Sequence, residues 1–216
     1  MNLASKKFKS VGLAVFVVGS LAVLAGAVLR TPKPPPPLAR LVNVQDVRDG
    51  ARAKTTDGQT IVYAAIRAPY RGEPLFEQSR DRNAELVANH RVRLRFDKVK
   101  RDHKQRLVAY VYYGKTFVNE TLVGEGLAYA RIQSDHTSHA DQLLAAQRTA
   151  RREQRGIWSQ PPPPPSPTYL GDPKYGNFHR PQCDKLSGIG ADRIVEYARR
   201  DAALDAGLAP CAKCRP

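Results

Sequence analysis

The sequence predicts an α+β chain that is mainly β: a small, partly open barrel of five strands with three helices, preceded by an apolar N-terminal helix and followed by a small C-terminal metal-binding module. Three observations predict this organisation. Five stretches rich in β-forming residues have helical stretches between and after them, which is typical of a barrel rather than a doubly wound sheet. An uncharged, mostly apolar run lies near the N-terminus. All three cysteines lie near the C-terminus.

The N-terminal segment, residues 1–30, has a basic start followed by the apolar run at residues 11–29. A run of that length can cross a hydrocarbon core as a helix, with Lys6, Lys7 and Lys9 held on the cytoplasmic side. We favour an uncleaved anchor, but the small residues 25–27 also resemble a cleavage site, so a removable signal peptide is the alternative. Both interpretations predict export. The anchored protein would face the periplasm or the exterior from the cytoplasmic membrane, and the cleaved one would be secreted.

Two proline-rich segments, residues 31–38 and 160–167, are predicted to form stiff polyproline spacers. They separate the N-terminal segment from a middle domain at residues 39–159, and the middle domain from a tail module at residues 168–216.

The middle domain contains five candidate strands, at residues 39–47, 51–56, 59–66, 90–99 and 106–113. The pair Asp57-Gly58 favours a hairpin before the third strand. The fourth strand alternates clearly, with Val92 and Leu94 on one side and arginines on the other. Helices are predicted at about residues 74–88, 117–126 and 136–154.

The chain has a formal net charge of +15. A basic surface favours a polyanionic partner, such as nucleic acid, an anionic membrane surface or an acidic wall polymer. A solvated surface that only keeps the protein soluble explains the charge equally well.

The tail module contains a His-x3-Cys pair, His179 and Cys183, and a Cys-x2-Cys pair, Cys211 and Cys214. Three thiolates and one imidazole at such spacings predict a closed, tetrahedral zinc site. So short a module also needs such a centre in order to fold. A disulfide between two of the cysteines, with the third left free, is the alternative for an exported chain.

The middle domain also carries a family pattern. The pair Ala109-Tyr110, the run VNETLVGEGLA at residues 118–128 and the closing Gly156-Ile157-Trp158 resemble a staphylococcal nuclease (thermonuclease) domain. The resemblance covers about residues 39–159. It implies an OB-fold barrel of five strands with three helices and, where the family is active, endonuclease-type hydrolysis of phosphodiesters.

The resemblance further implies calcium ligands, a general base and two arginines, and most of these are replaced. The second aspartate of the family's Asp-Gly-Asp-Thr turn falls on Ala51. The Asp and the Glu of its Asp-Thr-Pro-Glu motif fall on Arg67 and Tyr70, and the arginine of the preceding strand falls on Val62. Only the later arginine is retained, as Arg106.

These exchanges predict that the calcium-dependent reaction is lost. A guanidinium about 4 Å from a divalent cation repels it by several kcal/mol at an effective dielectric of ~20, so calcium is not expected at Arg67. A tyrosine is a poor base at neutral pH. Glu73 and Glu77 follow closely and are alternative acids, although one of them should sit on the next helix and point elsewhere.

Without the catalytic groups, the resemblance still implies a binding scaffold, because OB barrels hold single-stranded nucleic acid in a basic groove. Nucleic acid, either DNA or RNA, is predicted to contact a basic strip on the fourth strand and the following loop: Arg91, Arg93, Arg95, Lys98, Lys100, Arg101, Lys104 and Arg106. Arg67 adds a positive charge where a phosphate would lie. A solvated strand face is the alternative for the arginine row.

The tail resembles a second family. FHRPQC at residues 178–183 and ALDAGLAPCAKC at residues 203–214 are similar to the metal-binding domain of the Ada-type DNA-repair methyltransferases. In those proteins the first ligand is a cysteine that accepts a methyl group. Because His179 stands at that position, the resemblance implies the zinc fold and not methyl transfer.

These observations predict an exported, membrane-tethered, thermonuclease-like protein that is catalytically impaired and binds nucleic acid. An active phosphodiesterase that uses non-standard residues is the alternative. A second alternative is an envelope protein that binds peptide or wall polymer through the same barrel.

Overall fold

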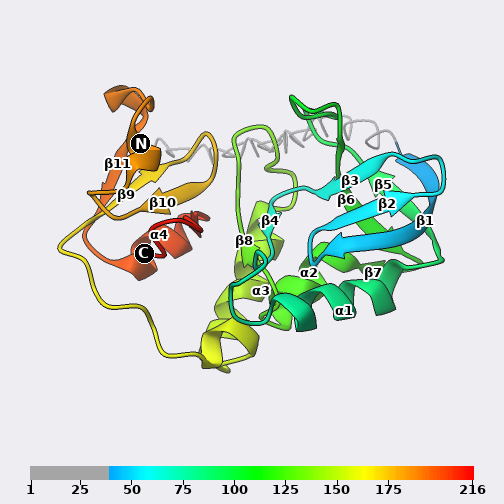
Figure 1. Cartoon of the computed structure of the whole chain (residues 1–216), viewed down its shortest axis with the longest axis horizontal. Helices are drawn as coiled ribbons and strands as arrows, with labels where there is room; N and C mark the ends of the chain where they lie inside the picture. The colour runs from blue at the N-terminus through cyan, green and yellow to red at the C-terminus, as the bar shows by residue number, and fades with distance from the viewer. Residues whose placement is uncertain (1–38) are drawn as a thin grey trace, which may run out of the picture. The chain divides into compact units, whose positions relative to one another are not determined.

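The computed structural model describes residues 39–216 of the chain (Figure 1). The predicted membrane anchor or signal peptide and the first proline-rich segment lie outside these residues. Within the described part, none of the helices has the length and apolar character needed to cross a bilayer.

Five strands form the barrel: β1 (Ala39–Asp49), β2 (Arg52–Thr55), β3 (Thr60–Tyr63), β5 (Arg91–Arg95) and β6 (Leu107–Tyr113). Antiparallel pairs join β1 to β2, β2 to β3, β1 to β5 and β5 to β6. The barrel is closed by a parallel pairing of β3 with β6, in which Ile61 lies opposite Leu107 and Tyr63 opposite Ala109. The expectation of a partly open barrel was therefore wrong: both strands are apolar, and pairing them buries both edges.

Short strands extend this framework. β7 (Thr116–Phe117) continues the sheet beyond β6, and β4 (Ile66–Arg67) pairs separately with β8 (Tyr129–Ala130). The β4–β8 pair is important for the site, because it fixes the backbone of Arg67 opposite Tyr129.

Three helices accompany the barrel, as predicted, with somewhat tighter bounds: α1 (Phe76–Val87), α2 (Val118–Gly124) and α3 (Ala140–Arg152). A 3-10 turn, η1 (Gly156–Ser159), follows α3. Figure 1 shows α1 and α2 along the same side of the barrel strands. Gly156 and Gly126 both have positive φ, and their backbones approach so closely that a Cβ on either one would lie within 2.5 Å of a carbonyl oxygen of the other segment.

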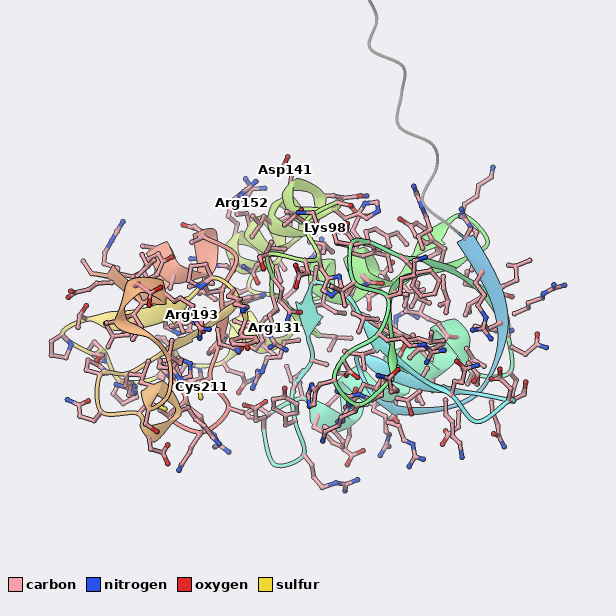
Figure 2. The ribbon with its side chains drawn as sticks, turned by 90° about the horizontal axis from the view of Figure 1, so that it is seen from above. Lys98, Arg131, Asp141, Arg152, Arg193 and Cys211 are labelled. Carbon is pink, nitrogen blue, oxygen red and sulfur yellow. The ribbon has the colours of Figure 1, made fainter. Side chains whose placement is uncertain are left out.

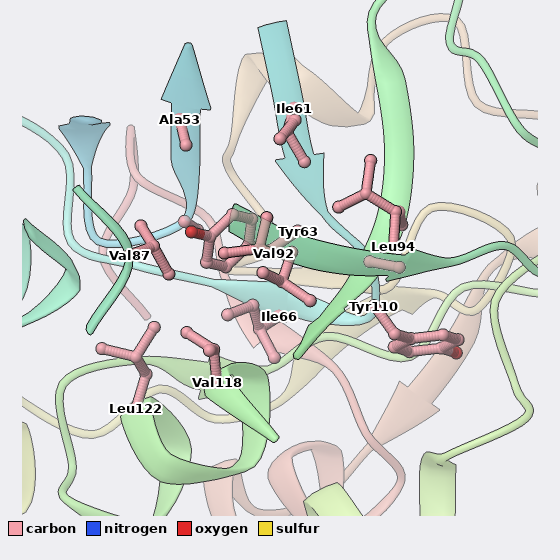
Figure 3. Packing of buried hydrophobic residues seen from close by; sticks show 14 of the residues in the cluster. Ala53, Ile61, Tyr63, Ile66, Val87, Val92, Leu94, Tyr110, Val118 and Leu122 are labelled. Atoms are coloured by element: carbon pink, nitrogen blue, oxygen red, sulfur yellow. The ribbon is translucent and has the colours of Figure 1, made fainter. Parts of the chain in front are cut away.

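The core lies inside the barrel and under the helices (Figure 3). Alternation places Val92 and Leu94 of β5 inward with no exposure, as the sequence pattern predicted. Leu122 from α2 and Val87 from α1 close the same cluster. Tyr63 is buried with the barrel, and its hydroxyl donates to Asn83 Oδ1 at 2.8 Å, so its polar end is satisfied.

The tail module forms a small sheet in the order β11-β9-β10-β12. Its elements are β9 (Tyr169–Asp172), β10 (Asn177–His179), η2 (Asp184–Leu186), η3 (Ala191–Arg193), β11 (Val195–Tyr197), α4 (Arg200–Asp205) and β12 (Ala209–Pro210). Five buried residues form its own core: Tyr169, Phe178, Ala203, Leu204 and Leu208. Such a core is small for independent stability.

The described residues nevertheless form one compact unit, because the tail packs on α3 and on the segment after β8. Gln147 of α3 donates to the Leu204 carbonyl at 3.1 Å, and the Ile132 amide donates to the Gly207 carbonyl at 2.7 Å. The linker is also tied down, since Arg180 donates to the Pro164 carbonyl at 2.7 Å. The second proline-rich segment therefore does not hold the two modules apart.

Candidate functional site

The turn between β1 and β2 holds the first part of the candidate site. Asp49 is buried, and its Oδ1 accepts the Ala51 amide at 2.9 Å while its Oδ2 accepts Arg52 Nε at 2.5 Å. Gly50 is required here because a Cβ would overlap Ser79 Oγ and lie 2.9 Å from the Ala68 Cβ. The one acid left in the turn is thus already paired, and Ala51 offers no ligand atom beside it.

Arg67, on β4, lies in the second part of the site. Its side chain is only 4% exposed, and its Nη2 contacts both carboxylate oxygens of Glu73, at 2.5 and 2.7 Å. Glu73 Oε2 also accepts the Tyr70 amide at 2.7 Å. The guanidinium carbon lies 4.7 Å from the centre of the Tyr70 ring and 5.3 Å from that of Tyr129. A buried ion pair with two aromatic rings close to its guanidinium therefore occupies this position.

This geometry settles what the two nearby acids do. Glu73 precedes α1 and turns back onto Arg67, so neither of its oxygens is free of Arg67. Glu77 lies on α1 and forms an exposed ion pair with Arg80. In this arrangement both carboxylates are paired with arginines, Glu73 through both of its oxygens and Glu77 through one.

Backbone pairing brings the remaining positions to the same region of the barrel. Val62 on β3 lies opposite Arg52 and Val108, and it offers no charge. Arg106 immediately precedes β6, and its Nε donates to Asp102 Oδ2 at 2.6 Å. Burial opposes ionisation of Asp102, but the hydrogen bonds from the side chain and the amide of Arg106 hold its pKa below the usual value. The retained arginine is therefore paired as well.

Comparison with known proteins matches residues 41–160 to the family model described as "Staphylococcal nuclease homologue". That range covers the closed barrel, α1 to α3 and the 3-10 turn, which is more than half of the chain. The chain belongs to this family.

The thermonuclease of Staphylococcus hyicus is 33% identical over 87 residues, which cover 40% of this chain and 52% of that protein. The SPbeta prophage-derived endonuclease YokF of Bacillus subtilis is 40% identical over 90 residues, covering 41% of this chain and 30% of YokF. The endonuclease YncB of the same organism is 39% identical over 90 residues, covering 41% and 43%. The chain thus spans about half or less of each of these relatives, and the family match ends before the tail module.

The basic strip is arranged as the strand pattern predicted. Arg91, Arg93 and Arg95 occupy the outward positions of β5, while Lys98, Lys100 and Lys104 are exposed in the loop. Arg93 lies over the Tyr112 ring at 4.8 Å. Arg101 is exposed and donates to Gln105 O and to Gln59 Oε1.

The eight cations of the strip are largely uncompensated. None of them except Arg106 pairs with an acid among the residues that the structure describes. Arg67, by contrast, is buried and neutralised, so it does not add free charge to this surface.

An aromatic cluster beside the strip was missed by the sequence reasoning. His139, just before α3, lies beside the rings of Tyr110, Tyr112 and Phe117, and its Nε2 lies 3.1 Å from the Tyr112 hydroxyl. Burial lowers the pKa of His139, so at neutral pH the ring is uncharged. The only sequence signal was a histidine before a helix, which is too weak to place it.

The tail module brings its four predicted ligands together. The candidate ligand atoms of His179, Cys183, Cys211 and Cys214 all lie within 4.8 Å of one another. No disulfide joins the cysteines, and backbone amides point at two of the sulfurs: Arg180 N lies 3.4 Å from Cys214 Sγ, and Lys213 N lies 3.4 Å from Cys211 Sγ. In a tetrahedral zinc site with bonds of ~2.0–2.3 Å, ligand atoms lie roughly 3.5–4 Å apart. The cluster could therefore hold a metal ion with little adjustment.

Proposed function

We propose that this chain is a nucleic-acid-binding member of the staphylococcal nuclease family whose phosphodiesterase centre has been lost. In this proposal it is exported, held at the membrane by its N-terminal segment, and carries a structural zinc ion in its tail. The single observation that carries the proposal is the buried ion pair of Arg67 and Glu73 at the position where the family resemblance places a metal ligand.

The ion pair opposes catalysis in two ways. Hydrolysis of a phosphodiester needs a cation on the phosphate and a carboxylate to activate water. A guanidinium in the cation site repels a divalent ion by several kcal/mol at about 4 Å and an effective dielectric of ~20. The nearest carboxylate, Glu73, is already bound to that guanidinium.

Binding of nucleic acid, unlike its hydrolysis, needs only the cations and aromatic rings that the chain retains. The basic strip supplies several cations without acidic partners, and phosphate contacts by such cations provide most of the affinity for nucleic acid. The relatives named as thermonuclease and endonucleases support nucleic acid as the polymer. A closed barrel of this topology favours single strands, because it can offer stacking rings beside a basic groove. Tyr113 is such a ring, since it is 40% exposed and stacked on His90.

Zinc is the metal that fits the tail, because soft thiolates with one imidazole are its usual structural ligands. His179, Cys183, Cys211 and Cys214 would hold it, and three of these ligands together carry the negative charge that a divalent ion requires. The ion would link His179 on β10 and Cys183 before η2 to Cys211 and Cys214.

A nuclease assay on the purified full-length chain tests the loss of catalysis. We expect no cleavage of DNA or RNA with calcium or with a chelator. Restoring the family groups in one variant, Ala51→Asp with Val62→Arg, Arg67→Asp and Tyr70→Glu, should introduce calcium-dependent cleavage if the scaffold is otherwise intact. Cleavage by the unmodified chain would support the alternative, an active phosphodiesterase with non-standard residues.

Binding is tested by titrating a labelled single-stranded oligonucleotide at several salt concentrations. Each phosphate contact should contribute roughly −0.7 to the slope of log K against log salt for a single strand. Reversing three exposed cations of the strip, with Arg91→Glu, Lys98→Glu and Lys104→Glu, should flatten the slope by about two. An absence of binding, or a flat slope, would favour a protein or neutral polymer as the partner.

Export and tethering are tested separately, by fractionating cells that make the chain. The proposal expects the protein in the membrane fraction after high-salt and alkaline washing, with the tail accessible to added protease. Recovery from the medium, with a new N-terminus near residues 25–27, would show that the segment is a cleaved signal.

A further inference from the structure

A cleft of about 910 Å³ is formed by α3, the proline-rich linker, α4 and the C-terminal residues. That volume is typical of clefts that bind small ligands. The family match ends at residue 160, so the walls contributed by the linker and the tail are additions to the family domain. The basic strip does not line this cleft.

The cleft is strongly positive. Three of its arginines have no acidic partner among residues 39–216: Arg148, Arg152 and Arg215. The two acids that line it are already engaged, since Glu73 pairs with Arg67 and Asp201 pairs with Arg151 at 2.7 Å. Arg152, at the end of α3, is labelled in Figure 2. Several uncompensated cations around a concave surface raise the local concentration of an anion.

The cleft also contains two aromatic rings. Tyr129 and Trp158 meet edge to face, with 5.2 Å between their ring centres. Arg151 lies over the Trp158 ring at 5.7 Å. A flat ring beside unpaired guanidinium groups suits a ligand that has both a base to stack and a phosphate to neutralise.

The walls are fixed relative to one another by specific contacts. Arg151 of α3 pairs with Asp201 and also with Asp205 of α4, the latter at 2.6 Å. Arg200 Nε donates at 2.9 Å to the terminal carboxylate of Pro216, which holds this residue against α4. Such preorganisation lowers the entropy cost of binding a ligand between the two walls.

From these observations we propose that the cleft binds a phosphate-bearing nucleotide, with its base on Trp158 and its phosphate between Arg148 and Arg152. The nucleotide is either free or the terminal residue of a nucleic-acid strand. This inference rests on the proposed function, because it places part of the nucleic-acid contact in the cleft rather than on the basic strip.

Trp158 is the only tryptophan of the chain, so its fluorescence reports on the cleft alone. The full-length protein, purified in detergent, is titrated with thymidine 5′-monophosphate, with a 5′-phosphorylated oligothymidylate, with the same oligomer lacking the phosphate, and with inorganic phosphate. We expect saturable quenching by a nucleotide and none by inorganic phosphate. Quenching by the mononucleotide identifies a free nucleotide as ligand, whereas quenching by the phosphorylated oligomer alone identifies a strand end.

Charge reversal tests the role of the arginines. Arg148→Glu with Arg152→Glu should weaken the nucleotide affinity by about tenfold or more, since hydrogen bonds to charged groups are each worth ~1.5–3 kcal/mol. The matched control, Arg48→Glu with Lys115→Glu, changes the net charge equally at two exposed positions outside the cleft and the strip. It should leave the quenching curve unchanged. Thermal unfolding of both variants checks that they are folded.

The two proposals fail in different ways. If the oligomer binds, but Trp158 fluorescence does not change and the cleft variant keeps its affinity, the cleft inference is overturned while nucleic-acid binding stands. If the mononucleotide quenches Trp158 but no oligomer binds, the cleft inference is supported and the proposed function is overturned. If nothing binds, both are overturned.

Discussion

Arg67 shows how a single exchange can reorganise a site without disturbing the fold around it. The backbone of β4 is fixed by its pairing with β8, so the residue at position 67 must point into the site whatever its charge. A cation there needs a counter-charge, and Glu73 supplies it through two short contacts. Breaking such a buried pair from one side leaves an uncompensated charge.

Glu73→Gln should therefore destabilise the protein by ~3–5 kcal/mol. The control is Glu77→Gln, which removes one exposed carboxylate from the same region and should change the free energy of unfolding by less than about 0.5 kcal/mol. Urea denaturation of the full-length chain measures both. Equal effects of the two substitutions would contradict a structural role for the Arg67–Glu73 pair.

A second residue-scale prediction concerns Asp102 and Arg106. The pKa of Asp102 is lower in the folded protein than the ordinary value of about 3.9, so its ionised form stabilises the fold above that pH. This contribution is lost as the pH falls through the folded pKa. Asp102→Asn should thus be less stable than the parent at pH 7, and the difference should shrink below about pH 4. Urea midpoints measured across this range check it, and a difference that does not vary with pH would count against it.

At the scale of elements, the strands and helices could be predicted because each depends on local pattern. The alternation in β5 assigned Val92 and Leu94 to the core, and both are fully buried. The closure of the barrel could not be predicted, because the parallel pairing of β3 with β6 joins residues more than forty positions apart. The return of Glu73 onto Arg67 was also missed, because it depends on where α1 begins, and sequence patterns place helix ends poorly.

The cluster of His179, Cys183, Cys211 and Cys214 was the most predictable part of the candidate sites. The spacing of the histidine and the cysteines predicted that the four side chains would lie together, and they do. The cleft could not be predicted, because its walls come from α3, the linker and α4. No sequence pattern groups their arginines, and these side chains line one surface only after the chain has folded.

The contact between the η1 segment and the end of α2 gives an element-scale prediction. Gly126 has φ +70°, and a Cβ there would lie 2.1 Å from the Arg155 carbonyl oxygen. Gly58 also has a positive φ, at +81°, but a Cβ there would meet nothing within 4 Å. Gly58→Ala should therefore cost about 1–2 kcal/mol from backbone strain alone. Gly126→Ala should cost clearly more, and thermal or urea unfolding of the two variants would show whether the crowding matters.

At the scale of the whole molecule, the tail depends on more than its own core. Five buried residues hold it internally, while Gln147, Ile132 and Arg151 tie it to the family domain. Structural zinc sites contribute ~10–16 kcal/mol to the folding of small modules at neutral pH. The proposed metal is therefore expected to decide whether the tail is folded.

We expect one zinc ion per chain by elemental analysis of the purified protein. Chelation, or Cys183→Ser, should unfold the tail while the barrel keeps its structure, so that the contribution of the tail to thermal unfolding is lost and the transition of the barrel remains. The control is Ser187→Ala, an exposed change in the turn that follows η2. A protein that contains no zinc and whose melting is unaffected by chelator would contradict the metal assignment.

Arg180 connects the histidine and cysteine cluster to the linker. Its side chain holds the carbonyls of Pro164 and Pro165, while its backbone amide lies against the sulfur of Cys214. Loosening the cluster would therefore release the proline-rich segment and open one wall of the cleft. In an exported chain, a shortage of zinc would then shorten the lifetime of the protein. Proteases can cleave a released proline-rich segment, whereas the packed segment is protected from them.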